Sequence, residues 1–364
     1  MSSGASEALA RIERDKSVRI GTLLVALTIA VSACSGTDEI ASRSASPREA
    51  QTSSPQPEPE LPEITTVRQA GGDAIRVPAS ADWVLVAFGR AWVSGVGKGV
   101  GFYETRTGRL QGSVAVPQSP CAGMDSGFGA VWTATCERPG IARIDPKTGK
   151  VTKWVAVDVP VDGESSIGAG EGGIWAIADG DDCGGCVLVR INPGTVKITD
   201  TYDVPEGGIA VRAGLGGIWI TNSLEDRVVQ VEPETGEVVS QIDVGLDPMF
   251  LDVGEGGVWV MNQADGSVSH IDPTTDQVVG TIPVDARDIF GGDLTVGAGF
   301  VWLRASDELV AQIDPTTDRV VARIGSPQAS GGVSAGQGQL WIAAHFEKPQ
   351  GWRAVLYRIP LGDG

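Results

Sequence analysis

The stretch that decides the fold is residues 254–260, GEGGVWV, because close variants of it recur along the chain. Residues 170–176 read GEGGIWA, and residues 214–220 read GLGGIWI. The same element marks seven tryptophans at spacings of 40, 43, 44, 40, 43 and 39 residues: Trp92, Trp132, Trp175, Trp219, Trp259, Trp302 and Trp341. A period near 40 with short apolar segments is typical of β-propeller blades.

Each repeat is consistent with four strands. In the fifth repeat we expect strands at residues 250–254, 258–262, 267–271 and 278–284, separated by Gly, Asp and Pro residues that favour turns. No segment shows a helical period of useful length. We interpret the repeated tryptophans as packing between blades, where burial of each ring contributes ~4–6 kcal/mol. We therefore predict an all-β fold, a seven-bladed β-propeller with four-stranded blades.

The two ends of the chain are predicted to close the ring together. The last repeat ends at Gly364 without room for a fourth strand, whereas residues 72–78 match the fourth strand of the fifth repeat. The N-terminal segment is therefore expected to complete the seventh blade and remove an open sheet edge. The propeller is assigned to residues 63–364.

A resemblance to known families adds to this interpretation. Residues 265–284, DGSVSHIDPTTDQVVGTIPV, resemble the YVTN-type bacterial propellers and the related virginiamycin B lyase-like family. The resemblance covers about residues 63–364 and implies the propeller fold. For the lyase-like enzymes it also implies histidines and a magnesium ion at the central face. The sequence departs from that pattern, because neither His270 nor His345 falls on a predicted innermost strand.

The N-terminus indicates export and lipidation. Basic residues within 11–19 precede a twelve-residue apolar run at 20–31, which is too short to span a bilayer but fits a signal peptide. The run ends in Val-Ser-Ala-Cys, which resembles the lipobox of bacterial lipoproteins and makes Cys34 the acylated residue. We assign residues 1–33 to a lipoprotein signal peptide and 34–62 to a disordered Ser/Pro/Glu-rich tether. The protein is therefore expected to be anchored in the cell membrane on its extracytoplasmic side.

Charge limits the range of partners. The chain has 28 basic and 46 acidic residues, a net charge of −18, which argues against nucleic acid. We expect a monomer that binds an envelope protein, a glycan or a small ligand. Whether the membrane is a plasma or an outer membrane stays open.

Four cysteines remain once Cys34 is assigned to lipidation, and export favours disulfides. Cys121 and Cys136 are expected to face each other across the first hairpin of the second repeat, and Cys183 is expected to pair with Cys186. The alternatives are a redox role for Cys183 and Cys186 and a four-cysteine zinc site.

Candidate ligand-binding residues lie in the two repeats that depart most from the pattern. They are Asp179, Asp181 and Asp182 in the third repeat, and His345 and Trp352 in the seventh, within a connection between the second and third strands. The acidic group could bind a hard cation, although a solvated turn explains it as well. His270 is expected on the solvated outer surface. No catalytic residue, resident metal or cofactor is assigned.

The preferred function is therefore a membrane-anchored lipoprotein whose propeller binds a ligand or partner through its loop face. The alternative is a metal-assisted lyase or hydrolase of the virginiamycin B lyase-like type that uses His345 and loop acids. A passive structural envelope protein is a third interpretation.

Overall fold

A computed structural model of the chain describes residues 61–77, 81–96, 99–116, 123–135, 139–158, 167–179, 186–284, 291–304, 308–326, 330–348 and 351–362. At positions 96, 179, 345–348, 351 and 352 the backbone alone is described. These residues form strands, turns and loops, and no helix among them could cross a membrane. The predicted signal peptide, Cys34 and nearly all of the tether lie outside them.

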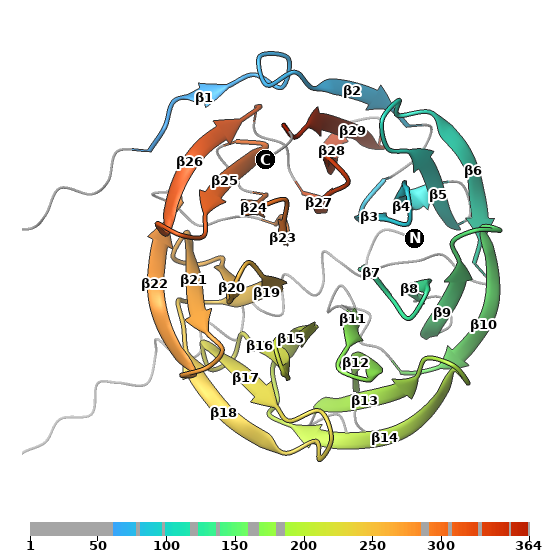
Figure 1. Cartoon of the computed structure of the whole chain (residues 1–364), viewed down its shortest axis with the longest axis vertical. Coiled ribbons are helices and arrows are strands. Elements are labelled where there is room, and N and C mark those ends of the chain that lie inside the picture. The colour runs from blue at the N-terminus through green and yellow to red at the C-terminus, as the bar shows by residue number, and fades with distance from the viewer. Residues whose placement is uncertain are drawn as a thin grey trace, which may run out of the picture. The chain divides into compact units, whose positions relative to one another are not determined.

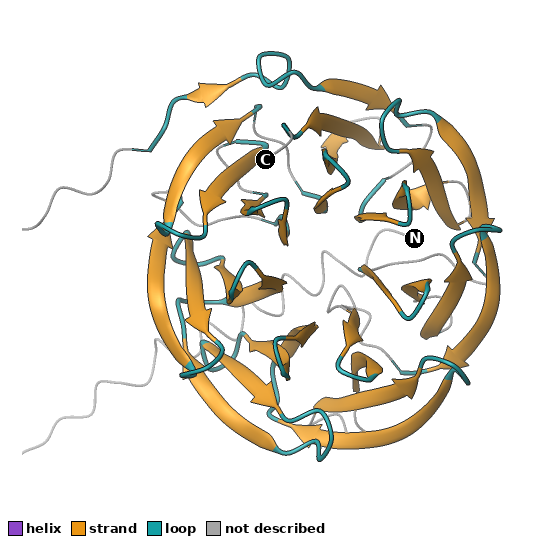
Figure 2. Ribbon diagram, in the orientation of Figure 1, coloured by secondary structure: helices purple, strands orange, loops and turns teal. Residues whose placement is uncertain are grey.

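The compact unit Leu61–Gly364 contains seven antiparallel sheets that form a ring (Figures 1 and 2). Blade 1 consists of β3 (Val84–Ala87), β4 (Arg90–Val96), β5 (Gly99–Glu104) and β6 (Leu110–Ala115). Blade 2 consists of β7 (Met124–Gly127), β8 (Ala130–Thr135), β9 (Gly140–Asp145) and β10 (Lys150–Ala156). Blade 3 consists of β11 (Ile167–Gly170), β12 (Gly173–Asp179), β13 (Cys186–Asn192) and β14 (Lys197–Val204). Blade 4 consists of β15 (Gly208–Gly214), β16 (Gly217–Asn222), β17 (Arg227–Val231) and β18 (Val238–Asp243). Blade 5 consists of β19 (Pro248–Gly254), β20 (Gly257–Asn262), β21 (Ser267–Asp272) and β22 (Gln277–Pro283). The predicted seven-bladed propeller is thereby confirmed.

The last two blades include strands from the N-terminal end of the described chain. Blade 6 consists of β23 (Leu294–Gly297), β24 (Phe300–Leu303), β25 (Val310–Asp314) and β26 (Arg319–Ile324), with β1 (Ile64–Thr65) added in parallel to β26. Blade 7 consists of β27 (Val333–Gly336), β28 (Gln339–Lys348), β29 (Gly351–Pro360) and β2 (Asp73–Arg76), which pairs with β29 in antiparallel register. Ring closure by an N-terminal strand is confirmed, and the extra strand β1 was not expected.

In every blade the chain runs from the innermost strand outward, which defines the two faces of the ring. The turn face carries the tight turns between the first and second strands and those between the third and fourth strands. The loop face carries the connection between the second and third strands and the connection to the next blade. The tight turn of blade 5 places Glu255 at φ 48° and Gly256 at φ 83°, the conformation of the two-residue turns that suit a twisted hairpin.

The seven repeated tryptophans are buried between blades, as the sequence predicted. Each is at most 2 % exposed. Trp341 of blade 7, for example, packs in a cluster with Val84 and Tyr103 of blade 1. In six blades the indole nitrogen donates to the carbonyl oxygen five residues earlier, as Trp219 does to Gly214 at 3.0 Å. Trp341 Nε1 makes no such hydrogen bond.

Two expectations about individual segments were wrong. Residues 345–348 and 351–352 are strands and not a loop, because β28 and β29 extend into a long hairpin that pairs His345 with Ala354 and Glu347 with Trp352. His270 is not a solvated surface residue: its ring stacks on Trp259 with centroids 3.8 Å apart, and its Nδ1 lies 2.9 Å from Asp318 Oδ1 of the next blade. A side chain opposite a tryptophan is covered by the neighbouring blade, and sequence position alone did not reveal this.

Candidate functional site

The structure separates the predicted ligand-binding residues into two places on the loop face. His345 and Trp352 lie on the paired strands of the blade 7 hairpin, two positions apart in the register. Asp179 ends β12 of blade 3 and pairs with Cys186, while Asp181 and Asp182 lie outside the described residues. Blades 1 and 2 stand between blades 7 and 3 on the shorter path around the ring. The structure therefore brings His345 and Trp352 onto one hairpin and places Asp179 in a different blade.

The disulfide predictions fall mainly outside the described chain. Cys121, Cys136 and Cys183 are not among the described residues, whereas Cys186 begins β13 as a half-buried free thiol. The expected pairings stay predictions. In the described part of the chain, no group of three or more His, Cys, Asp or Glu side chains is placed to hold a metal ion.

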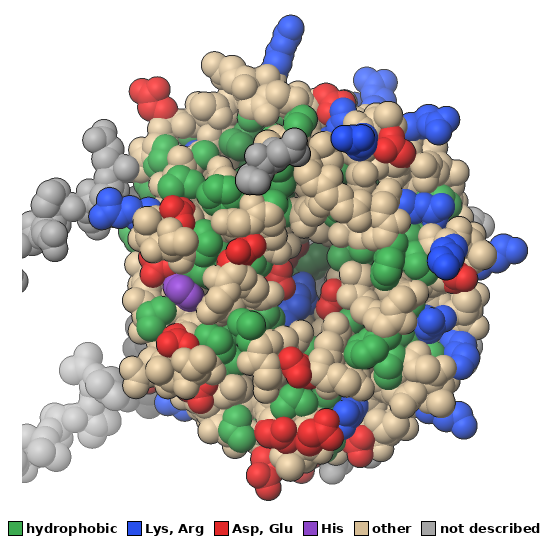
Figure 3. All heavy atoms as spheres, viewed as in Figure 1, with side chains coloured by type: hydrophobic (Ala, Val, Ile, Leu, Met, Phe, Trp, Pro, Cys, Tyr) green, Lys and Arg blue, Asp and Glu red, His purple; other side chains and the backbone are tan. Residues whose placement is uncertain are grey.

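One residue of each innermost strand pairs with the repeated tryptophan of its blade, and these seven residues surround the centre of the ring. We call them the channel ring: Leu85, Asp125, Gly168, Arg212, Asp252, Thr295 and Ser334. Three of the seven are charged. Figure 3 shows Lys or Arg and Asp or Glu side chains inside the hollow at the centre of the turn face.

Arg212 connects the acidic members of the channel ring. Its Nε lies 3.6 Å from Asp252 Oδ1, and these two side chains are 16 % and 21 % exposed. Its Nη1 donates to the carbonyl oxygens of Ile167 in blade 3 at 3.3 Å and Val211 at 3.0 Å. Gly168 lets the innermost strands of blades 3 and 4 approach closely, because a Cβ there would lie 3.0 Å from the Ala213 nitrogen and 3.1 Å from the Arg212 Cα. The guanidinium therefore spans two blades.

Three members of the channel ring tie neighbouring blades together through one repeated hydrogen bond. Asp125 Oδ2 accepts the N–H of Ala169 at 2.8 Å, and Asp252 Oδ2 accepts the N–H of Val296 at 2.8 Å. Ser334 Oγ accepts the N–H of Val86 at 2.9 Å. Because each acceptor reaches the innermost strand of the next blade, these polar groups stabilise the ring, and the N–H donors compensate for their partial burial.

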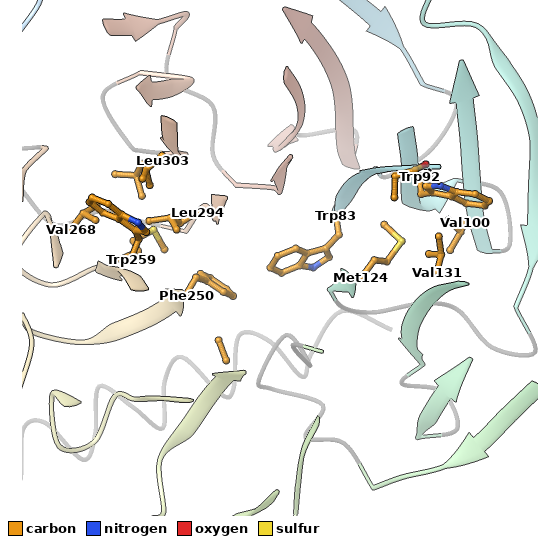
Figure 4. Close-up of a cluster of buried hydrophobic side chains, with 14 of the residues drawn as sticks. Trp83, Trp92, Val100, Met124, Val131, Phe250, Trp259, Val268, Leu294 and Leu303 are labelled. Carbon is orange, nitrogen blue, oxygen red and sulfur yellow. Dashed lines mark hydrogen bonds between the residues drawn. The ribbon is translucent and has the colours of Figure 1, made fainter. Parts of the chain in front are cut away.

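An aromatic contact crosses the centre of the propeller beside the channel ring. Trp83 of blade 1 and Phe250 of blade 5 meet edge to face with centroids 5.4 Å apart, although their blades are not neighbours. Figure 4 shows the two side chains pointing toward each other across the centre. Both are buried, and each lies two residues before a member of the channel ring. A ligand in the hollow of the turn face would therefore meet aromatic rings before it reached the loop face.

Two buried carboxyls lie in and beside the channel. Burial raises the pKa of Asp125 to about 6, against the lowering effect of Arg212. Burial raises the pKa of Asp293 to about 7, although its two oxygens accept the N–H groups of Leu294 at 2.8 Å and Val333 at 3.0 Å. Both are consequently titratable near neutral pH.

Blade 6 also contains a buried ion pair near Asp293. Glu308 is fully buried and accepts hydrogen bonds from Arg323 Nε at 2.9 Å and Nη2 at 2.6 Å. Arg304, itself 1 % exposed, donates to the carbonyl of Leu309 at 3.1 Å. Burial lowers the pKa of the Arg304 guanidinium to about 10, which still leaves it charged at neutral pH. Each charge has partners nearby, as buried charges require.

Sequence reasoning missed the channel ring. Its members stand seven residues before each repeated tryptophan, so the spacing that located the tryptophans also locates them. Their identities differ from blade to blade, however, and no shared chemistry marks the position.

Comparison with known proteins supports the fold. A scan against protein-family models finds no match, and a search of curated proteins finds none either. Among solved structures, the RRP9 WD40 repeats align with TM-score 0.65 at 10 % identity, over 83 % of this chain and 100 % of that chain. U3-55K aligns with TM-score 0.63 at 9 % identity, over 80 % and 98 % of the two chains. The computationally designed Ika8 protein aligns with TM-score 0.56 at 12 % identity, over 74 % and 83 %. At these identities the likeness concerns the propeller fold alone.

Proposed function

We propose that this chain is a lipid-anchored extracytoplasmic binding protein whose propeller receives a protein, glycan or small ligand at its loop face. The observation that carries the proposal is the blade 7 hairpin. Strand β28 continues seven residues past Trp341 to Lys348, whereas the corresponding strands of blades 4 and 5 end three residues past theirs, at Asn222 and Asn262. A long hairpin that carries His345 and Trp352 gives this face a recognition element that blades 4 and 5 lack.

Anchoring through Cys34 rests on the sequence of the N-terminus, where an apolar run ends in Val-Ser-Ala-Cys. Metabolic labelling with a fatty-acid analogue tests the anchor. We expect label on the wild-type protein and none on a Cys34→Ser variant, and label that persists in this variant would contradict the proposal.

The role of the hairpin can be tested by a graft within the chain. Residues 345–354 are replaced by the connection of blade 5, residues 263–266, which joins strands that end at the same register position. Thermal-shift screening of both proteins against a glycan and metabolite panel should give ligands that stabilise the wild type alone. The graft should keep the wild-type melting temperature. Ligands that stabilise both proteins equally would contradict a role of the hairpin.

Membership of the YVTN-type group is part of the proposal and rests on the sequence resemblance. The alternative of a metal-assisted lyase or hydrolase rests on the same resemblance and on His345.

A further inference from the structure

We propose that the turn face carries a second docking surface, formed by Phe88, Phe128 and the basic turns of blades 1 and 2. We further propose that it binds an acidic protein segment with an apolar side chain. This surface lies on the face opposite the blade 7 hairpin and does not depend on it.

The two phenylalanines adopt a left-handed backbone conformation that bulky residues disfavour. Phe88 and Phe128 are the first residues of the tight turns in blades 1 and 2, at φ 53° and 52°, and a glycine with positive φ follows each. Bulky residues are unfavourable in this left-handed region by ~1–2 kcal/mol, and the turn type prefers Asn, Asp or Gly. The fold therefore does not favour phenylalanine at either position.

The side chains of Phe88 and Phe128 are also exposed, at 45 % and 46 %. Glu171 and Glu255 occupy the same turn position in blades 3 and 5, and there each carboxylate accepts an N–H from the next blade's turn, Gly216 or Gly299, at 3.0 Å. Among the described residues, neither Phe88 nor Phe128 has an aromatic or cation–π contact. A strained, exposed aromatic residue without an aromatic or cation–π partner among the described residues is better explained by binding than by folding.

The part of the chain that carries the two phenylalanines has a net positive charge. Residues 81–158, which include blades 1 and 2, contain nine basic and six acidic residues, whereas residues 208–284, which include blades 4 and 5, contain two basic and twelve acidic. Arg106, Arg109, Lys147 and Lys150 are exposed at the outer turns of blades 1 and 2. Figure 3 shows Lys and Arg side chains along the right side of the turn face, where these blades lie.

The acidic residues of these outer turns are already engaged within the turns. Glu104 accepts the N–H groups of Arg106 and Thr107, and Asp145 accepts those of Lys147 and Thr148. Hydrogen bonds within each turn lower the pKa of both carboxyls, for Glu104 chiefly the contact with Thr107 and for Asp145 chiefly the N–H of Lys147. Both carboxylates therefore stay ionised, and it is the excess of nine basic over six acidic residues in 81–158 that remains to attract an external anion.

The size of the basic half decides the class of partner. A long polyanion such as a nucleic acid would extend onto the acidic half formed by blades 4 and 5 and be repelled there. A short acidic segment fits within blades 1 and 2 and can place one apolar side chain against the two rings. Electrostatic complementarity then sets specificity, and burial of the rings supplies affinity.

The test uses a labelled synthetic peptide in which one tryptophan is flanked by glutamates. Fluorescence anisotropy measures its binding to the full chain and to a Phe88→Asn/Phe128→Asn variant. Asparagine suits the left-handed turn, so this variant should fold at least as well as the wild type. Leu215→Asn is the matched control, because Leu215 occupies the same turn position on the acidic half at φ 54° and 46 % exposure.

We expect the double variant to lose at least about tenfold in affinity, while Leu215→Asn and the blade 7 graft bind as the wild type does. Replacing the tryptophan of the peptide by alanine, or its glutamates by lysines, should weaken binding similarly. The proposal is overturned if the double variant binds the peptide like the wild type. It is also overturned if a single-stranded oligonucleotide binds more tightly through the same residues, or if the chain instead self-associates through them.

Discussion

Asp293 offers the sharpest test of how the ring is stabilised. The side chain is 4 % exposed, and burial raises its pKa to about 7. Because the unfolded chain has the ordinary value of 3.8, the folded state binds the proton more tightly. Stability from this group is therefore fully present below about pH 4, is lost as the pH rises toward 7, and is constant above that.

The magnitude follows from the gap between the two pKa values. At about 1.36 kcal/mol for each pKa unit, ionisation of Asp293 in the folded state costs about 4 kcal/mol at high pH. About half of this loss, ~2 kcal/mol, falls between about pH 5.5 and pH 8. That window stays above the isoelectric point of about 4.5, where the chain is least soluble.

The perturbation is Asp293→Asn, which cannot ionise. Its amide oxygen can accept one of the two N–H groups now bound by the carboxylate, so the variant loses some stability at every pH. The loss of wild-type stability between about pH 5.5 and pH 8 should nevertheless shrink by about 2 kcal/mol. Urea unfolding followed by tryptophan fluorescence at both pH values measures the difference.

Asp200→Asn serves as the control, because Asp200 is exposed on β14. It should retain the wild-type difference between the two pH values. If Asp293→Asn also retains the full wild-type difference, the buried carboxyl does not control the pH dependence, and its hydrogen bonds outweigh its burial.

Three further predictions concern the ring and its core. Trp219→Phe should destabilise the protein by about 1–2 kcal/mol more than Trp341→Phe in urea unfolding. The reason is that Trp219 Nε1 donates a hydrogen bond to a carbonyl oxygen, whereas Trp341 Nε1 does not. Equal losses of stability would show that this hydrogen bond does not stabilise the fold. Deletion of residues 63–77 removes β1 and β2 and should cause aggregation in light scattering, whereas a soluble and equally stable product would contradict ring closure. Arg323→Met should lower the free energy of unfolding by ~3 kcal/mol or more, because Glu308 loses its two hydrogen bonds from Arg323. Adding Glu308→Gln to this variant should restore part of the lost stability in the same urea assay.

The sequence predicted the features that repeat in every blade. One buried tryptophan for each blade fixes the number of blades, and the strand missing after Ile359 required a partner from elsewhere, which β2 supplies. Both predictions depend on local pattern and on the need to satisfy a sheet edge, and these are legible in a single chain.

The features that the sequence did not reveal depend on contacts between blades. His270 reaches Asp318, which lies 48 residues later, so neither residue indicated the pair alone. The segment 345–352 departs from the repeat and the sequence therefore predicts a loop there, whereas β28 continues to Lys348 and β29 begins at Gly351. The channel ring uses different chemistry in each blade, so its constant spacing from the tryptophans did not mark it as a site.

Hydrogen–deuterium exchange of the intact chain, with and without a ligand from the screening panel, tests the proposed binding function most directly. We predict that the ligand slows exchange in the blade 7 hairpin, at residues 339–360, and leaves the tight turns of the opposite face unchanged. Slower exchange only outside the hairpin, or a ligand-induced change confined to the turn face, would contradict loop-face recognition.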